Sequence, residues 1–334
     1  MTGRERFLAV LHGRKPDRTP VGHISALTTA ELQQTTGCFM PEVHLDAEKL
    51  VRLCAANHEV LGFDAVTFII NYFGEPAAAG VEMNWGSPSE YPIFASHPWR
   101  EPEDAAVPGD LLDRPPVKTY LDALKLARRD YGDRLAVLGK VMGPFSMVQA
   151  MHGVEQTMLD VMDAPDEVRS FLRVAADVLV RCANAQFAVG IDAISIGEGG
   201  AGANMLSPQM YDDLLRETHR RMLRRIDGPT ILHMCGDITP RLDSLKQIPL
   251  DFFHFDWAIK PKAMKAAAEG KFKLVGNVNT KDLLMAGPDE IARQVVENLE
   301  AGVEMIAPGC AVSPNCPNAN FIAMTDAVRK WHGG

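Results

Sequence analysis

The sequence predicts an α/β fold: a single (β/α)8 TIM barrel over residues 1–334, with an elaborated N-terminal segment and a proline-rich loop over the barrel mouth. Short apolar runs recur along the chain, and a helical pattern follows most of them. Several runs are apolar at both alternating positions, as is typical of parallel strands that are buried on two faces. Eight such units in one chain indicate a closed barrel.

Each predicted strand is a short run rich in valine, isoleucine, leucine or phenylalanine, such as "DAVTFII" or "IDAISIG". Polar residues follow most runs, which suggests that each strand ends at a functional or solvent-facing edge. The eight predicted strands are residues 20–25, 64–70, 135–141, 191–197, 230–235, 251–256, 273–278 and 304–310.

The helices between the strands carry recognisable start and stop residues. Ser207 is placed to accept the first free N–H groups of a helix, and Pro208 suits its first position. A later helix opens at Pro288 and stops at Gly302, a residue that tolerates the left-handed backbone of a helix end.

One segment breaks this alternation. Residues 84–117 are rich in proline and show little periodicity. A long loop in a compact domain is usually functional or mobile, so this segment is expected to lie over the barrel mouth, with an inert surface excursion as the alternative.

The composition of the chain limits its expected partners, its location and the roles of its cysteines. The net charge of −9 argues against a nucleic-acid or anionic-membrane partner, because it offers no basic surface for phosphates. No apolar run is long enough to cross a bilayer, and a cytoplasmic location is expected. Six irregularly spaced cysteines do not form a disulfide framework and are expected to be buried, catalytic or metal-binding.

Polar residues gather where the predicted strands end, and in such barrels these ends share one mouth, where active sites lie. We expect binding or catalytic roles there for His23, Asn71, Glu198, His233, Cys235, Asp256, Asn277, Asn279 and Cys310.

His233 and Cys235 have the two-residue spacing of a strand, so their side chains are expected to point the same way. With Cys310 they form a ligand set that suits tetrahedral zinc and leaves its fourth position to an exchangeable group. Asp256 or Glu198 is a candidate fourth ligand. Taken singly, a strand-end cysteine or histidine is more often structural, and Cys316 is a weaker rival ligand on a loop.

The chain resembles the uroporphyrinogen decarboxylase superfamily nearly from end to end. The similarity lies in the opening "RERFLAVLHGRKPDRTPV", in "GPFSMVQAM", "LHMCGD" and "FDW", and in "GNVN" and the closing "PGC". The resemblance implies a single barrel domain of this family over the whole chain.

Departures from the decarboxylase pattern change the expected chemistry. The decarboxylases carry an arginine-rich motif where this chain reads "GHISALTT". Their central aspartate, active-site tyrosine and late histidine align with Asn71, Ala150 and Cys310. Decarboxylation of a tetrapyrrole with many carboxylates is therefore not expected.

The chain is instead similar to the methylcobamide:coenzyme M methyltransferase branch, which works with a separate corrinoid protein. This resemblance implies that His233, Cys235 and Cys310 bind Zn2+, and that a methylated corrinoid protein supplies the methyl group as methylcobamide. Catalytic roles are expected for Asp256 and Glu198. Binding of substrate or cofactor is expected for His23, Asn71, Asn277 and Asn279.

The ligand types favour a thiol as the methyl acceptor. A free alkyl thiol is mostly protonated at neutral pH, whereas a zinc-bound thiol loses its proton. Two cysteine thiolates donate charge to zinc and keep the bound thiolate reactive, whereas three histidines suit the activation of water.

A zinc-activated thiol is therefore the expected acceptor, and the resemblance implies coenzyme M as that thiol. Tetrahydrofolate or another pterin bound by Asp256, Asn277 and Asn279 is the alternative. Uroporphyrinogen decarboxylation and a non-catalytic corrinoid-binding or metal-storage role are the competing functions.

Overall fold

The computed structural model describes residues 1–69 and 73–333. Its main sheet has seven parallel strands in the order β1-β4-β5-β6-β7-β8-β9, and a small antiparallel pair is formed by β2 and β3. The strands are β1 (Ala65–Thr67), β2 (Met83–Asn84), β3 (Ile93–Phe94), β4 (Ala136–Met142), β5 (Ala193–Gly197), β6 (Thr230–Met234), β7 (Phe252–Phe255), β8 (Lys273–Val278) and β9 (Met305–Pro308).

Residues 20–25 close the sheet into a barrel without forming a full strand. Val21 makes an isolated parallel bridge with Ile306 of β9, and its carbonyl accepts a hydrogen bond of 2.8 Å from the N–H of Asp64, next to β1. The predicted first strand is thus reduced to one bridge residue, and the chain bends at residues 24–25 soon after it. The (β/α)8 barrel fold is confirmed.

Side chains alternate between the inside of the barrel and the layer of helices outside it, as the two-residue period of strands requires. Ile231 packs in the inner cluster with Ala193 and Val275, whereas Leu232 and Met234 belong to the outer cluster. At the opposite end from the mouth, Phe7 stacks on Phe252 with ring centroids 5.8 Å apart. Positions 233 and 235 therefore lie on the inward side of β6.

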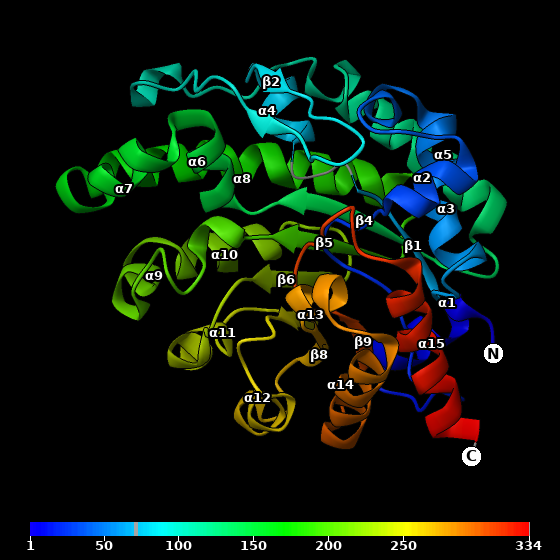
Figure 1. Cartoon of the computed structure of the whole chain (residues 1–334). Helices are drawn as coiled ribbons and strands as arrows, with labels where there is room; N and C mark the ends of the chain where they lie inside the picture. The colour runs from blue at the N-terminus through cyan, green and yellow to red at the C-terminus, as the bar shows by residue number, and fades with distance from the viewer. Residues whose placement is uncertain (70–72, 334) are drawn as a thin grey trace.

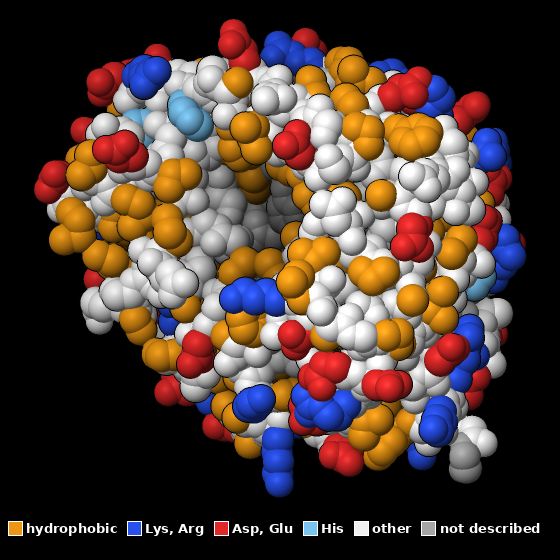
Figure 2. Space-filling view, in the orientation of Figure 1, with side chains coloured by type: hydrophobic (Ala, Val, Ile, Leu, Met, Phe, Trp, Pro, Cys, Tyr) orange, Lys and Arg blue, Asp and Glu red, His pale blue; other side chains and the backbone are white. Residues whose placement is uncertain are grey.

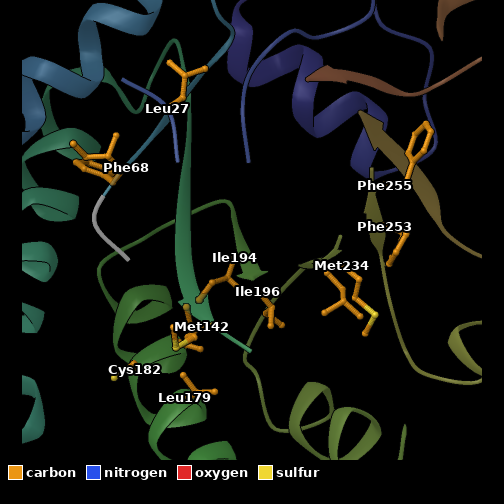
Figure 3. Close-up of a cluster of buried hydrophobic side chains, with 14 of the residues drawn as sticks. Leu27, Phe68, Met142, Leu179, Cys182, Ile194, Ile196, Met234, Phe253 and Phe255 are labelled. Carbon is orange, nitrogen blue, oxygen red and sulfur yellow. The ribbon is translucent and has the colours of Figure 1, made fainter. Parts of the chain in front are cut away.

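Helices surround the sheet (Figure 1). In Figure 3, Ile194 and Ile196 lie on the side of β5 that faces Leu179 and Cys182 of α8. The helices are α1 (Gly3–Leu11), α2 (Ala30–Thr36), α3 (Ala47–Glu59), α4 (Gly74–Ala78), α5 (Val117–Tyr131), α6 (Pro144–His152), α7 (Val154–Asp163), α8 (Pro165–Ala188), α9 (Pro208–Leu214), α10 (Arg216–Leu223), α11 (Leu242–Leu245), α12 (Pro261–Ala268), α13 (Thr280–Met285), α14 (Pro288–Ala301) and α15 (Asn318–Gly333). The 3-10 helices are η1 (Glu42–Leu45), η2 (Pro102–Asp104), η3 (Leu111–Asp113), η4 (Gly199–Ala201) and η5 (Thr239–Arg241).

The predicted start of one helix and the predicted end of another are confirmed. The Ser207 side chain accepts a hydrogen bond from the N–H of Met210 at the start of α9. Gly302 ends α14 with a left-handed φ of 75°. The helix that begins at Pro208 is interrupted at Leu215, where φ of −109° departs from the helical value, so α9 and α10 are separate.

The proline-rich segment 84–117 lies over α6 at the barrel mouth (Figure 1). The Trp99 N–H donates to the Met151 carbonyl at 2.9 Å, and the Trp99 ring stacks on Phe171 at 5.7 Å. Phe94 of β3 reaches the cavity at the mouth. The segment is therefore packed against the barrel and contributes to the mouth, which favours the functional interpretation over an inert excursion.

Within the described residues, helices long and apolar enough to cross a membrane are absent.

Candidate functional site

His233, Cys235 and Cys310 meet at the mouth of the barrel. The Cys235 Sγ lies 3.3 Å from His233 Nε2 and 3.5 Å from Cys310 Sγ, and the Cys310 Sγ lies 3.5 Å from His233 Nε2. His233 and Cys235 come from the end of β6, and Cys310 follows β9, on another part of the barrel. Among the described residues this is the one group of three or more candidate metal ligands that lie together.

The spacing of the three atoms fits one tetrahedral ion. Zinc–sulfur bonds of about 2.3 Å and a zinc–nitrogen bond of about 2.0–2.1 Å, at tetrahedral angles, separate two sulfurs by about 3.8 Å and sulfur from nitrogen by about 3.6 Å. The three observed separations of 3.3–3.5 Å are within a few tenths of an ångström of those values. The two thiols and the imidazole can therefore hold one zinc ion without rearrangement of the strands.

The backbone fixes which nitrogen of His233 is available. His233 Nδ1 lies 3.1 Å from the carbonyl oxygen of His254, so Nδ1 carries the proton and donates it. Nε2 is then left unprotonated and faces the two sulfurs, as a metal ligand must.

The two candidate thiol ligands, Cys235 and Cys310, have pKa values shifted in opposite directions. The hydrogen bond from Cys235 lowers the pKa of Cys310, against the effect of burial. The same hydrogen bond, reinforced by burial, raises the pKa of Cys235. Of the two thiols, Cys310 is therefore the first to lose its proton, and binding of a cation would displace the proton that remains on Cys235.

A cavity of about 260 Å³ opens beside the three ligands. Figure 2 shows the molecule hollowed at this mouth, with hydrophobic side chains around it. The cavity is lined by Ser25, Phe94, Met142, Ser146, Gln149, Ala150, Val154, Gly197, Gly199, Gly200, His233, Cys235, Cys310 and Ala311. A small molecule in this cavity would contact the sulfurs directly.

The loop after β5 approaches this cavity closely. A Cβ at position 200 would lie 2.2 Å from Gln149 Oε1, and a Cβ at position 202 would lie 3.2 Å from the Cys235 carbonyl oxygen. Glycine at Gly200 thus lets the loop pass over α6, and Gly202 lets it pass beside Cys235.

Glu198, expected to be catalytic, is fully buried beneath the cavity wall and engaged by protein groups. Its carboxylate accepts hydrogen bonds from the N–H of Phe145 at 3.1 Å and of Ser146 at 2.8 Å, at the start of α6. It also accepts from Ser146 Oγ at 2.8 Å, and His219 Nε2 lies 2.9 Å away. Glu198 therefore fixes the position of α6, one wall of the cavity.

Asp256, Asn277 and Asn279 lie on the neighbouring strand ends. Asp256 Oδ1 accepts a hydrogen bond from the Ala258 N–H at 2.8 Å. Asn277 Nδ2 donates to the carbonyls of Asp256 and Ile259 at 3.1 and 2.7 Å. Asn277 and Asn279 line a separate polar cavity of about 130 Å³ beside Trp257.

His23 contacts protein groups other than the three candidate ligands. The His23 ring is buried, with Nδ1 2.9 Å from the Ser25 carbonyl and Nε2 3.2 Å from Asn57 Nδ2. Burial lowers the pKa of His23 to about 3. Asn71 lies outside the described residues. The binding roles of both residues stay predictions.

Sequence reasoning missed three residues that the site depends on. His254 supports His233 and lies inside a strand, where its pattern is that of an ordinary core residue. His219 contacts Glu198 from α10, and no spacing connects the two. Ser25 lines the cavity, and its only signal was its place in a segment that lacks arginine.

The chain belongs to the uroporphyrinogen decarboxylase (URO-D) family, whose model matches residues 2–331. It is 29% identical to a methylcobamide:CoM methyltransferase MtaA from Methanosarcina barkeri, over 99% of this chain and 98% of the relative. It is 26% identical to a methylated-thiol–coenzyme M methyltransferase from Methanosarcina mazei, over 99% and 90% of the two chains.

A solved structure of a methyltransferase from Methanosarcina mazei superposes on the chain with a TM-score of 0.96 and 29% identity, covering 99% of both chains. The resemblance to the methylcobamide:coenzyme M methyltransferases is thereby confirmed. These relatives are methyltransferases, in agreement with the class of enzyme that the sequence indicates.

Proposed function

We propose that this chain is a corrinoid-dependent methyltransferase that moves a methyl group from a methylated corrinoid protein to a thiol. The observation that carries the proposal is the triangle of one imidazole nitrogen and two sulfurs, 3.3–3.5 Å apart, at the edge of a small apolar cavity. The names of the relatives, which give a cobamide donor and a thiol acceptor, support it.

His233, Cys235 and Cys310 would hold Zn2+. A zinc ion bound there would lower the pKa of a substrate thiol and hold the resulting thiolate at the site. A set with two cysteines retains more electron density on such a thiolate than three histidines would.

The reaction is a displacement at carbon. The acceptor sulfur forms the S–CH3 bond, and the carbon–cobalt bond breaks with its electron pair remaining on cobalt, so Co(III) becomes Co(I). The proton of the thiol leaves to solvent. Methyl cobamide and thiol thus give thioether, Co(I) cobamide and a proton.

The protein residues position the reacting groups and exclude water from the acceptor sulfur. Met142, Phe94 and Val154 line the cavity with apolar surface that excludes water from the sulfur. The cavity of about 260 Å³ holds a small thiol but not a whole macrocycle, so the cobamide would be presented at the mouth by its carrier protein. Glu198 keeps α6 aligned along this opening. We place the reaction in the cytoplasm, where thiols stay reduced.

The test combines metal content with methyl transfer. Elemental analysis is expected to find about one zinc per chain, and Cys310→Ser or His233→Ala should reduce it several-fold. Free methylcobalamin should be demethylated when a thiol is present, and both variants should be inactive. Cys316→Ser serves as control, because Cys316 is buried outside the ligand cluster. Zinc-free protein that methylates no thiol would refute the proposal.

A pterin acceptor is the alternative, with Asp256, Asn277 and Asn279 as its hydrogen-bonding groups. The polar cavity lined by Asn277 and Asn279 is the observation in its favour. Coenzyme M and tetrahydrofolate offered in parallel decide between them. Methylation of tetrahydrofolate that survives the loss of zinc would establish the pterin function.

A further inference from the structure

The cavity beside the three ligands is lined by uncharged side chains apart from the ligands themselves. Among its described lining residues there is no lysine or arginine. Figure 2 shows Lys or Arg side chains near the hollow only at its rim.

Glu198 places a buried carboxylate behind the cavity wall. The free N–H groups at the start of α6, which could have bound an anion, are instead satisfied by Glu198. A sulfonate or carboxylate at the far end of a zinc-bound thiol would lose its hydration without a lysine or arginine beside it among the described lining residues, which is unfavourable.

One polar atom in the lining is left without a partner. The Ser25 side chain is 3% exposed, and its Oγ makes no hydrogen bond within the described part of the chain. A buried hydroxyl in this condition costs free energy unless a ligand or water completes it. Nearby, Gln149 Nε2 makes only long contacts, 3.4 Å to the Gly200 carbonyl and 4.0 Å to Met158 Sδ. Both side chains can serve a neutral polar group.

We propose that the methyl acceptor is a small uncharged thiol whose polar end is bound by the Ser25 hydroxyl, with Gln149 beside it, and that anionic thiols such as coenzyme M are poor acceptors. This inference rests on the proposed function and narrows its substrate class. Ser25 is then a specificity-determining residue, and its hydroxyl hydrogen-bonds to a hydroxyl or amide on the acceptor.

Two thiols that differ only in their tail test the charge. In 2-mercaptoethanol a hydroxyl stands where coenzyme M has a sulfonate, two carbons from the sulfur in each. Calorimetric titration of the zinc-loaded protein should give a Kd at least tenfold lower for 2-mercaptoethanol. With methylcobalamin as donor, kcat/KM should rank the two thiols in the same order.

Substitutions test the assigned residues. Ser25→Ala should raise KM for 2-mercaptoethanol about 3- to 10-fold, the size of one hydrogen bond, and should leave kcat nearly unchanged. The Tm of Ser25→Ala should not fall, because the native hydroxyl has no protein partner. A purely structural serine would instead lower the Tm.

A cation added at the cavity edge should reduce the preference for 2-mercaptoethanol over coenzyme M. Val154 lines the cavity and is 50% exposed, so Val154→Lys places an ammonium there without burying it. This variant should improve kcat/KM for coenzyme M severalfold. Leu159→Lys, also 50% exposed and on α7 but outside the lining, is the matched control and should not.

Coenzyme M that binds the native protein as tightly as 2-mercaptoethanol, or an unchanged KM in Ser25→Ala, would overturn the inference. In that case zinc content and methylation of coenzyme M would still stand, so the proposed function would survive. Failure of the proposed function has a different signature: no zinc and no methylation of either thiol.

Discussion

At the scale of single residues, His254 joins the two strand ends that carry the candidate ligands. Its carbonyl accepts from His233 Nδ1, and its Nε2 lies 2.7 Å from the Pro308 carbonyl, two residues before Cys310. The ring centroids of His233 and His254 are 4.4 Å apart. Burial keeps the pKa of His254 well below its usual value, so the ring is neutral and can donate from one nitrogen only.

We expect His254→Phe to weaken zinc binding about 10- to 100-fold, because a ring of similar size stays but the hydrogen bond to Pro308 is lost. Competition with a chelator measures the affinity. His58→Phe removes a comparable bond from a ring nitrogen to the Phe63 carbonyl away from the site and is the control. Equal zinc affinity in native protein and His254→Phe would exclude a supporting role for His254.

His44 makes the stability of the protein depend on pH. It is 1% exposed, and among the described residues neither ring nitrogen has a hydrogen-bond partner. Burial lowers its pKa from 6.5 to about 4. The unfolded chain thus binds a proton more readily between these values, and the contribution of neutral His44 is lost as pH falls from about 6.5 to 4.

We expect His44→Phe to remove up to about 3 kcal/mol of this acid-induced loss in the free energy of unfolding. Urea titrations of both proteins at pH 7 and pH 4.5 measure it. Parallel loss of stability in the two proteins across this range would contradict the assignment.

At the scale of elements, the start of α6 is held by a carboxylate that comes from the end of β5. Glu198 accepts hydrogen bonds from two backbone N–H groups and one hydroxyl of α6, and it contacts His219 of α10. Charge-assisted bonds of this kind stabilise a helix N-terminus. Glu198 therefore positions α6, and the catalytic role expected for it from the sequence stays a prediction.

We expect Glu198→Ala to reduce the free energy of unfolding by about 2–4 kcal/mol, because several buried donors lose their partner. Glu198→Gln keeps the shape and should lose less. Urea unfolding measures both, and Glu155→Ala, an exposed acid in the first turn of α7, is the control. Full stability in Glu198→Gln combined with a collapsed kcat would instead support direct catalysis.

Local patterns predicted most elements, because buried parallel strands and capped helices leave their mark within a few residues. The strand that carries His233 and the helix end at Gly302 are examples. The bridge at Val21 depends on two distant edges, and the role of Glu198 depends on how β5 meets α6. The spacing of His233 and Cys235 suggested ligands, whereas no local signal marks the unpartnered hydroxyl of Ser25.

At the scale of the whole molecule, closure of the barrel depends on ionic contacts to one buried carboxylate. Asp64 accepts from Arg6 Nη1 at 3.0 Å, from Arg18 Nη1 and Nη2 at 2.7 and 2.8 Å, and from the Val21 N–H at 2.9 Å. It thus ties the N-terminal segment to β1 at the point where the sheet closes.

We expect Asp64→Ala to lower the free energy of unfolding by about 3 kcal/mol or more, since it leaves two arginines and a backbone N–H beside an empty position. Asp130→Ala removes a surface pair with Arg129 and should cost less than about 1 kcal/mol. Thermal and urea unfolding measure both. A similar loss in the two variants would mean that Asp64 is not central to closure.

The ligand pair Cys235 and Cys310 lies 75 residues apart in the chain, and this has a consequence for biosynthesis. At about 5–20 residues per second, a ribosome needs about 4–15 s to make the residues between them. During that interval the nascent chain contains His233 and Cys235 but not the third candidate ligand, Cys310. Metal binding by all three residues is thus a late event in the synthesis of this protein. In a cell with too little reductant, the Cys235 thiol is open to oxidation before translation ends.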